Sequence, residues 1–537
     1  MIAIGLFTGR RNKSTEQYFL AGKAFSGWVI GISFIGSIIS SVTFLAIPAD
    51  AFKTAWLRFI PNLAFPVITI LAAFIFIPFY RRGTITSAYG YLAARFGSSI
   101  SYYAAVIFLV SQLSKTSTIA YLLSILLESI TGWDFVICLL VVTGVTIIYT
   151  VKGGVVAVIW TDVIQTFILL AAAFVCIGYV VHSLPGGFAT LVSEASSWHK
   201  FAFNYDVQVA ADSAAREAIQ AGLPADMPAA AVRDAALPLH GRLLAPVPWG
   251  FMLGEKTVLM MLLLGFFQFL GVITDQSTVQ RWCAAKTARE ARRSMFVLGF
   301  GCLPVWALFQ FLGTSLFVYY IFNADRLACE ALLGLRKAEH ILPHFITNSL
   351  PAGFVGVVIA GALAAAMSTL SASINTSSMV FVDDIYKKFG GRGGGDPFYL
   401  RLGRISSFVA ALVMIAGALF IRMLDAPTLT DLSQQIAAII AGGVPGVFLA
   451  GMLTRRVNMT GAWAGLLASL LFVLWIKAGD AGWLPDALRV RLLPHYLAIA
   501  GNVIAIAIAW PVSMLAPRGA RDLANLTLWD QGKSPLQ

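Results

Sequence analysis

The feature that most constrains this chain is a series of twelve long apolar runs that contain almost no charge. A helix needs about 20 mostly apolar residues to cross a bilayer. Strands of a membrane barrel would alternate apolar and polar residues, whereas these runs are continuously apolar. We therefore predict an all-α polytopic membrane protein. The predicted spans lie near residues 27–48, 60–80, 101–127, 135–151, 163–181, 258–274, 295–322, 354–382, 405–421, 436–453, 457–476 and 496–515.

The composition excludes an ordinary soluble protein. Of the 537 residues, 58% are hydrophobic and only 12% are charged, whereas soluble domains carry about 25% charged residues. The formal net charge of +12 would suggest nucleic acid in a soluble protein. Here the basic residues lie in short loops between the apolar runs, which indicates membrane topology instead. We expect the lipid bilayer as a partner and no nucleic acid.

The positions of Lys and Arg predict the orientation. If span 1 begins in the cytoplasm, 23 of the 38 Lys and Arg residues fall in inner segments, Arg281 among them, 14 fall outside, and one, Lys115, lies within span 3. Both termini are then cytoplasmic, and residues 183–255 form an external loop with amphipathic helical pieces such as 212–221. The apolar start, residues 1–7, is too short to span and predicts the end of a truncated helix. We expect a multi-pass protein of the plasma membrane, or of the inner membrane in a bacterium.

Two spans are interrupted at matching positions. Span 1 carries Gly36 and four hydroxyl residues between positions 37 and 43, and span 6, five spans later, carries Gly265, Gln268 and Gly271. Interrupted helices at equivalent places in two inverted halves indicate the central site of a transporter. The alternative is that small residues only let helices pack closely.

Span 8 is rich in hydroxyl groups, with Ser368, Thr369 and Ser371 near its centre. Hydroxyl and carbonyl oxygens are hard ligands of the kind that a small alkali cation accepts, and transporters use unwound backbone for the same purpose. Hydroxyl-rich faces also pack helices together, so this feature alone does not decide between a cation site and a packing surface.

Lys115 is the one basic residue near the middle of a span. An ionisable residue there costs at least about 2.5–3.5 kcal/mol on insertion, so it normally faces a cavity or a partner. The alternatives are a fixed internal counter-ion and a neutral lysine.

Five segments, in order along the chain, resemble the sodium/solute symporter family, which includes sodium-coupled sugar, proline, pantothenate, sialic acid and monocarboxylate carriers. They are YFLAGKAFSGW (18–28), TSAYGYLAARFG (86–97), GGVVAVIWTDVIQ (153–165), TDQSTVQRWCAAKTAREARRS (274–294) and AAAMSTLSASINTSSMVFVDDIY (364–386). The resemblance continues to about residue 465.

The resemblance implies a five-plus-five inverted-repeat, LeuT-like transporter fold with two further C-terminal helices. It implies the following division: 1–25, a truncated helix and cytoplasmic linker; 26–182, the first repeat; 183–255, the external loop; 256–453, the second repeat; 454–516, two peripheral helices; and 517–537, a cytoplasmic tail.

The resemblance also implies a sodium site between spans 1 and 8. Its ligands would be span 1 carbonyls, the Ala365 carbonyl and two hydroxyls, at Gly36, Ile39, Ala365, Ser368 and Thr369. A second sodium, present in part of the family, would use Asp162, Ser368, Ser371 and the next residue. That residue is Ala372, which has no hydroxyl, so the second site is incomplete. The alternative for Asp162 is a helix N-cap at the start of span 5.

The implied substrate pocket departs from the sugar carriers. Thr43 replaces the glutamine that contacts sugar, and Gly271 replaces the tyrosine that closes over it, so hexoses are disfavoured. In some branches a basic residue of span 3 faces the substrate, and by analogy Lys115 would bind a carboxylate. The candidate polar lining is Thr43, Asn62, Lys115 and Gln268.

We predict a symporter that imports a small organic solute with Na⁺ as the coupling ion, by alternating access, without an organic cofactor. A channel would repeat its pore lining by oligomeric symmetry, and no histidine lies in the middle of a span to serve an intramembrane enzyme. A proton-coupled carrier of the same fold and a transporter-like sensor remain open, as do the identity of the solute and the oligomeric state.

Overall fold

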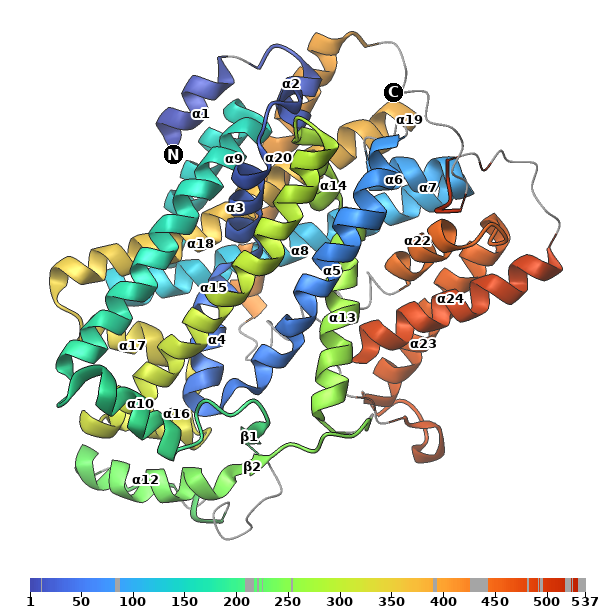
Figure 1. Cartoon of the computed structure of the whole chain (residues 1–537). Helices are drawn as coiled ribbons and strands as arrows, with labels where there is room; N and C mark the ends of the chain where they lie inside the picture. The colour runs from blue at the N-terminus through green and yellow to red at the C-terminus, as the bar shows by residue number, and fades with distance from the viewer. Residues whose placement is uncertain are drawn as a thin grey trace.

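The chain folds into a bundle of long helices (Figure 1). The computed structural model describes residues 1–10, 12–82, 87–207, 217–219, 222–224, 226–252, 255–389, 394–424, 443–480, 482–490, 492, 496–516, 523 and 525–529. Helices α2 (Thr15–Leu20) and α14 (Gln276–Ala284) lie toward the upper end of Figure 1, and α12 (Ala229–Leu243) lies at the lower end. These two ends correspond to the predicted cytoplasmic and outer sides.

The first half of the chain supplies the helices around the predicted break in span 1. They are α1 (Ile2–Gly9), α3 (Gly27–Ile38), α4 (Ser41–Lys53), the 3₁₀ helix η2 (Trp56–Ala64), α5 (Phe65–Leu71), the π-helical turn η3 (Ala72–Phe76), α6 (Ile77–Arg82), α7 (Ala88–Phe96), α8 (Ser98–Thr131) and α9 (Phe135–Ser183).

The second half repeats the pattern of long helices. It contains α13 (Val258–Thr274), α15 (Ala288–Phe322), α16 (Arg326–Leu332), α17 (Ile341–Asn348), α18 (Ala352–Met379) with its π-helical continuation η5 (Val380–Tyr386), α19 (Lys387–Phe389), α20 (Asp396–Leu424), α22 (Val444–Leu453), α23 (Met459–Asp480) and α24 (Leu497–Leu515).

Every predicted span coincides with a helical segment, although residues 436–442 of span 10 lie outside the described residues. Within the described part of the chain, seven helices are long and apolar enough to cross a membrane, or up to nine if each of two bent helix pairs is one span. Two further apolar helices, Val444–Leu453 and Ile499–Leu515, are shorter. The chain is a multi-pass membrane protein.

Helix α9 covers two predicted spans. Its 49 residues would extend roughly 74 Å as one straight helix, more than twice the hydrocarbon thickness of about 30 Å. Gly154 interrupts it with a left-handed φ of 57°. A Cβ at this position would lie 2.6 Å from the backbone oxygen of Tyr18, so both the conformation and the close approach require glycine. The break separates predicted spans 4 and 5.

The external loop is more varied than predicted. It contains α10 (Gly187–Ser197) and α12, and also a short antiparallel pair of strands, β1 (Tyr205–Val207) and β2 (Leu244–Pro246), in which Asp206 pairs with Ala245. Most of the amphipathic segment predicted at 212–221 lies outside the described residues; within it, 217–219 are helical.

The centre of the bundle is built from four helices that are far apart in the sequence. Helix α18 packs along α9, and α3 packs against both α9 and α15. The break in span 1 is therefore enclosed by helices, and its backbone groups need polar partners because lipid cannot supply them.

Candidate functional site

Span 1 is broken as predicted. Helix α3 ends at Ile38, Ile39 has an extended backbone (φ −83°, ψ 99°), and α4 begins at Ser41. The two helical halves meet at an angle of 62°. The extended backbone turns the Ile39 carbonyl away from the helix axis, which is the arrangement that exposes a carbonyl to a ligand.

Span 6 is broken elsewhere than predicted. Gly265, Gln268 and Gly271 all lie inside the regular helix α13, and the 55° bend occurs at Asp275, between α13 and α14. The prediction of an interruption at the glycines is wrong. Gly265 instead permits close packing, because a Cβ there would lie 2.0 Å from the backbone oxygen of Pro61.

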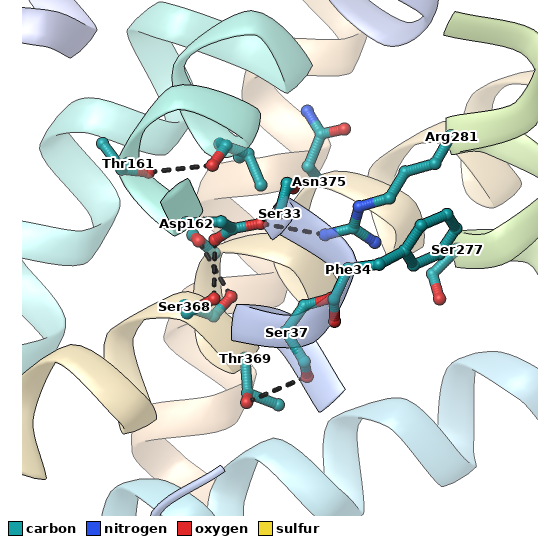
Figure 2. A network of polar contacts seen from close by, with 12 residues as sticks. Ser33, Phe34, Ser37, Thr161, Asp162, Ser277, Arg281, Ser368, Thr369 and Asn375 are labelled. Atoms are coloured by element: carbon teal, nitrogen blue, oxygen red, sulfur yellow. Dashed lines mark hydrogen bonds and ion pairs between the residues drawn. The ribbon is translucent and has the colours of Figure 1, made fainter. Parts of the chain in front are cut away.

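Spans 1, 5 and 8 converge at the break. A Cβ on Gly36 would lie 2.8 Å from the Asp162 backbone oxygen and 3.4 Å from Ser368 Oγ, so glycine brings α3 directly onto both helices. Thr369 Oγ1 lies 3.3 Å from the Ser37 oxygen and 3.4 Å from the Ala365 oxygen. Figure 2 shows Ser37, Ser368 and Thr369 close together beside Asp162, so hydroxyl and carbonyl oxygens of spans 1 and 8 meet at the break.

Asp162 lies beside this cluster and is fully buried. Its Oδ1 accepts a hydrogen bond of 2.7 Å from Ser368 Oγ, and its Oδ2 accepts one of 2.9 Å from Ser33 Oγ. It is eight residues beyond the break at Gly154, inside the helix, so the alternative that it caps a helix start is wrong. Ser371 Oγ does not join the carboxylate in this arrangement but donates to the Ser368 backbone oxygen at 3.0 Å.

Arg281 completes the environment of Asp162. Its Nη2 lies 3.0 Å from Asp162 Oδ2, and its guanidinium lies 5.0 Å from the centre of the Phe34 ring. Figure 2 shows this side chain reaching from α14 toward Asp162. Arg281 falls in a segment that the pattern of basic residues predicts to be a cytoplasmic loop, whereas only 4% of its surface is exposed. A buried carboxylate in a membrane requires such a partner.

The rest of α14 is tied to its neighbours through its glutamines, at the end of the bundle that the sequence predicts to be cytoplasmic. Gln280 Nε2 donates to the Phe19 oxygen and to Asn375 Oδ1, both at 2.8 Å, and its Oε1 accepts from Thr376. Gln276 Oε1 accepts from the Ala88 backbone N–H at 2.6 Å. This helix belongs to segment 274–294, one of the five that resemble the family, and its glutamines form hydrogen bonds with α2, α7 and α18.

A cavity of about 380 Å³ lies on the outer side of the break. Three of the predicted substrate contacts, Thr43, Asn62 and Gln268, line it together. Its aromatic and aliphatic walls and few polar groups are typical of small-molecule sites. The lining comprises Ile38, Thr43, Ile47, Asp50, Leu57, Arg58, Pro61, Asn62, Lys256, Met261, Leu264, Gln268, Phe269, Trp306 and Tyr496.

Lys115 is not among the residues that line this cavity. The Lys115 side chain is exposed, but its neighbours on the same face of α8 are buried. These neighbours are Phe108, Gln112 and Ile119, at positions i−7, i−3 and i+4. Residues at this spacing share one helix face, so Lys115 points into the bundle and not toward lipid. Within the described residues it makes no ion pair, and the Asp275 carboxylate is within electrostatic reach.

Comparison with known proteins places this arrangement in a family. Residues 18–469 match the family model described as the sodium:solute symporter family. The chain is 26% identical to the sodium/sialic acid symporter NanT of Aliivibrio fischeri, over 89% of this chain and 85% of that protein. It is 27% identical to the sodium/sialic acid symporter SiaT of Proteus mirabilis, over 89% and 88% of the two chains.

The fold is also that of a solved transporter. The structure resembles that of a Na⁺-coupled sialic acid symporter in a substrate-bound outward-open state, with a TM-score of 0.80 at 23% identity over 97% of this chain and 96% of the other. This likeness confirms the predicted five-plus-five inverted-repeat fold. The matched family and its members are transporters and not enzymes. The chain is a sodium-coupled solute symporter and belongs to the sodium:solute symporter family.

Proposed function

We propose that this symporter imports a small organic carboxylate together with sodium, across the plasma membrane or the bacterial inner membrane. The observation that carries the proposal is the convergence of the broken span 1 with the hydroxyls of Ser368 and Thr369, next to a cavity that opens on the outer side.

The coupling sodium is assigned to the oxygen cluster at the break. The Gly36 and Ile39 carbonyls, the Ala365 carbonyl and the hydroxyls of Ser368 and Thr369 are its ligands in this proposal. Three features fit a small hard cation: neutral oxygen donors, two helices at close approach and an extended residue at the break.

The predicted second sodium site, at Asp162 and Ser371, is incomplete. In the described arrangement the Asp162 charge is balanced by Arg281, and Ala372 provides no hydroxyl. A second sodium would need Arg281 to move away, so one sodium is assigned, at the first site.

We assign the solute site to the cavity at Thr43, Asn62 and Gln268. Lys115, which does not line this cavity, is assigned to bind the carboxylate of the solute at a later stage of transport. A lysine that faces the interior of the bundle without an ion pair among the described residues is a functional candidate on energetic grounds. Two relatives, a sodium/sialic acid symporter and a sodium-coupled monocarboxylate transporter, carry substrates with a carboxylate, which supports this class of solute.

The test is uptake by purified protein in liposomes. A sodium gradient should drive accumulation of at least one acid from a panel of N-acetylneuraminate, pyruvate, lactate and nicotinate, and glucose should not compete. A pH gradient without sodium should drive none. Uptake driven only by protons would contradict sodium coupling, and uptake restricted to neutral solutes would contradict the carboxylate.

A further inference from the structure

We propose that the outer mouth of the cavity is a carboxylate-capture site, in which Arg58 and Lys256 bind the acid group of the incoming solute. This inference rests on the proposed import of a carboxylate and adds a separate recognition site to it. The site is distinct from Lys115, which does not line the cavity.

The cavity has a charged rim and a polar floor, and the same three elements build both. Helix α4 carries Thr43 and then Asp50 as it runs outward. The chain through η2 runs inward from Arg58 to Asn62. The chain through α13 runs inward from Lys256 to Gln268. Twelve residues of helix rise about 18 Å, which is roughly the distance along the chain axis between the two. In each element the charged residue lies nearer the outer end. A solute therefore meets the charges before it reaches the floor.

Each rim cation is held by an acid that is less exposed than the cation itself. Arg58 Nε lies 3.1 Å from Asp50 Oδ2, and the two side chains are 47% and 32% exposed. Lys256 contacts Asp206 Oδ2, with exposures of 36% and 10%. The more buried acids thus orient the more exposed cations. The cations are the more accessible partners of both pairs.

Arg58 retains donors for a ligand. Its ion pair with Asp50 uses Nε, and within the described residues no protein group accepts from Nη1 or Nη2. The guanidinium presents these nitrogens as a fork that matches the two oxygens of a carboxylate. Lys256 adds a second cation to the lining of the same cavity. Two cations beside apolar walls raise the local concentration of anions.

The chemistry of this rim selects one class of solute. A cationic solute would meet two cations whose acids are already paired with them, and a neutral sugar would gain no charge-assisted hydrogen bond from the guanidinium fork. An organic acid gains charge-assisted hydrogen bonds at the mouth and leaves its remaining groups for Thr43, Asn62 and Gln268.

The test compares Arg58→Gln, Lys256→Gln and the double variant in sodium-driven uptake by liposomes, with pyruvate and N-acetylneuraminate as probes and pyruvamide as the neutral competitor. The double variant should raise KM for the transported acid about tenfold. Maximal rate per inserted protein and the sodium half-saturation should stay within about twofold of wild type, because the rim lies away from the sodium cluster. Arg58→Lys should recover part of the loss, and the wild-type sensitivity to ionic strength should fall in the double variant.

The matched control is Arg489→Gln. Arg489 lies in the predicted outer loop before α24 and forms a comparable exposed ion pair, 2.8 Å from Asp486, but does not line the cavity. An unchanged KM in the double variant, while wild type transports an acid, would overturn this inference alone. An equal rise in KM in the Arg489→Gln control would overturn it as well. If wild type imports none of the acids under a sodium gradient, the proposed carboxylate function fails, and the capture site fails with it.

Discussion

Arg281 Nη2 lies 3.0 Å from Asp162 Oδ2, although 119 residues separate the two in sequence and both side chains are almost completely buried. The pair joins helix α14 to the middle of the bundle, directly beside the proposed sodium ligands. Because Ser33 and Ser368 also donate to the same carboxylate, we expect a change at Arg281 to alter the surroundings of the proposed coupling site.

The first prediction concerns this pair. Arg281→Gln leaves a buried carboxylate unpaired and should lower the free energy of unfolding by about 3–5 kcal/mol, whereas Asp162→Asn combined with Arg281→Gln should restore part of it. Thermal unfolding of purified protein in a fixed detergent measures both. Arg289→Gln, at an exposed arginine of the same cytoplasmic region, is the control and should leave the melting temperature unchanged. A double variant less stable than either single variant would contradict a direct ionic interaction.

The second prediction concerns the oxygen cluster. Changing both Ser368 and Thr369 to Ala removes two hydroxyl ligands and should raise the sodium half-saturation of uptake about tenfold or more, since each tenfold change corresponds to about 1.4 kcal/mol. Ser378→Ala is the matched control, because this hydroxyl lies on the same helix but bonds to the Gly403 oxygen. Uptake by the double variant with the wild-type sodium response would refute the assignment.

The third prediction concerns Lys115. Lys115→Gln should weaken affinity for the transported acid by about ten- to a hundredfold, because hydrogen bonds to charged groups contribute about 1.5–3 kcal/mol. Lys115→Arg should keep part of the uptake, since it retains the charge. Competition by the acid and by its neutral amide separates loss of the charge contact from a general loss of solute binding, because the amide should lose far less affinity than the acid. Normal transport of the acid by the glutamine variant would show that Lys115 has another role.

The fourth prediction concerns Lys200, in the external loop. Its Nζ donates to the Phe52 and Thr54 carbonyls at 2.7 and 2.9 Å, and thereby fixes the outer end of α4. Burial lowers the pKa of Lys200 well below its ordinary value. Between this lowered pKa and the unfolded value of about 10.4, the unfolded chain binds more protons than the folded chain. Stability conferred by this residue should therefore rise with pH across that window.

The measurement is the melting temperature as a function of pH for wild type and Lys200→Met. The melting temperature of wild type relative to Lys200→Met should rise with pH and level off above the pKa of lysine in the unfolded chain. The exposed Lys337→Met variant serves as the control and should show a constant difference. A constant difference for Lys200→Met as well would mean that its pKa is the same in the folded and unfolded chains.

The sequence by itself determined which segments cross the membrane, because the thickness of the bilayer imposes a length of apolar helix that can be counted along the chain. It also determined the break in span 1 and the oxygen-rich centre of span 8, since glycine and clustered hydroxyls act on the local backbone. The resemblance to a family predicted one sodium site with Gly36, Ser368 and Thr369 and a second, incomplete site with Asp162, and the structure brings these four residues close together.

Tertiary packing alone decided the partners of these residues. Arg281 looked like a loop charge because the count of basic residues ignores where a segment folds, and α14 turns back into the bundle. Gly265 looked like a helix interruption, but the proximity of Pro61 gives it a packing role. The rim at Arg58 and Lys256 could not be predicted, since it depends on three outer segments that meet in space. Apolar length is a property of one segment, whereas ion pairs and cavities depend on distances between segments.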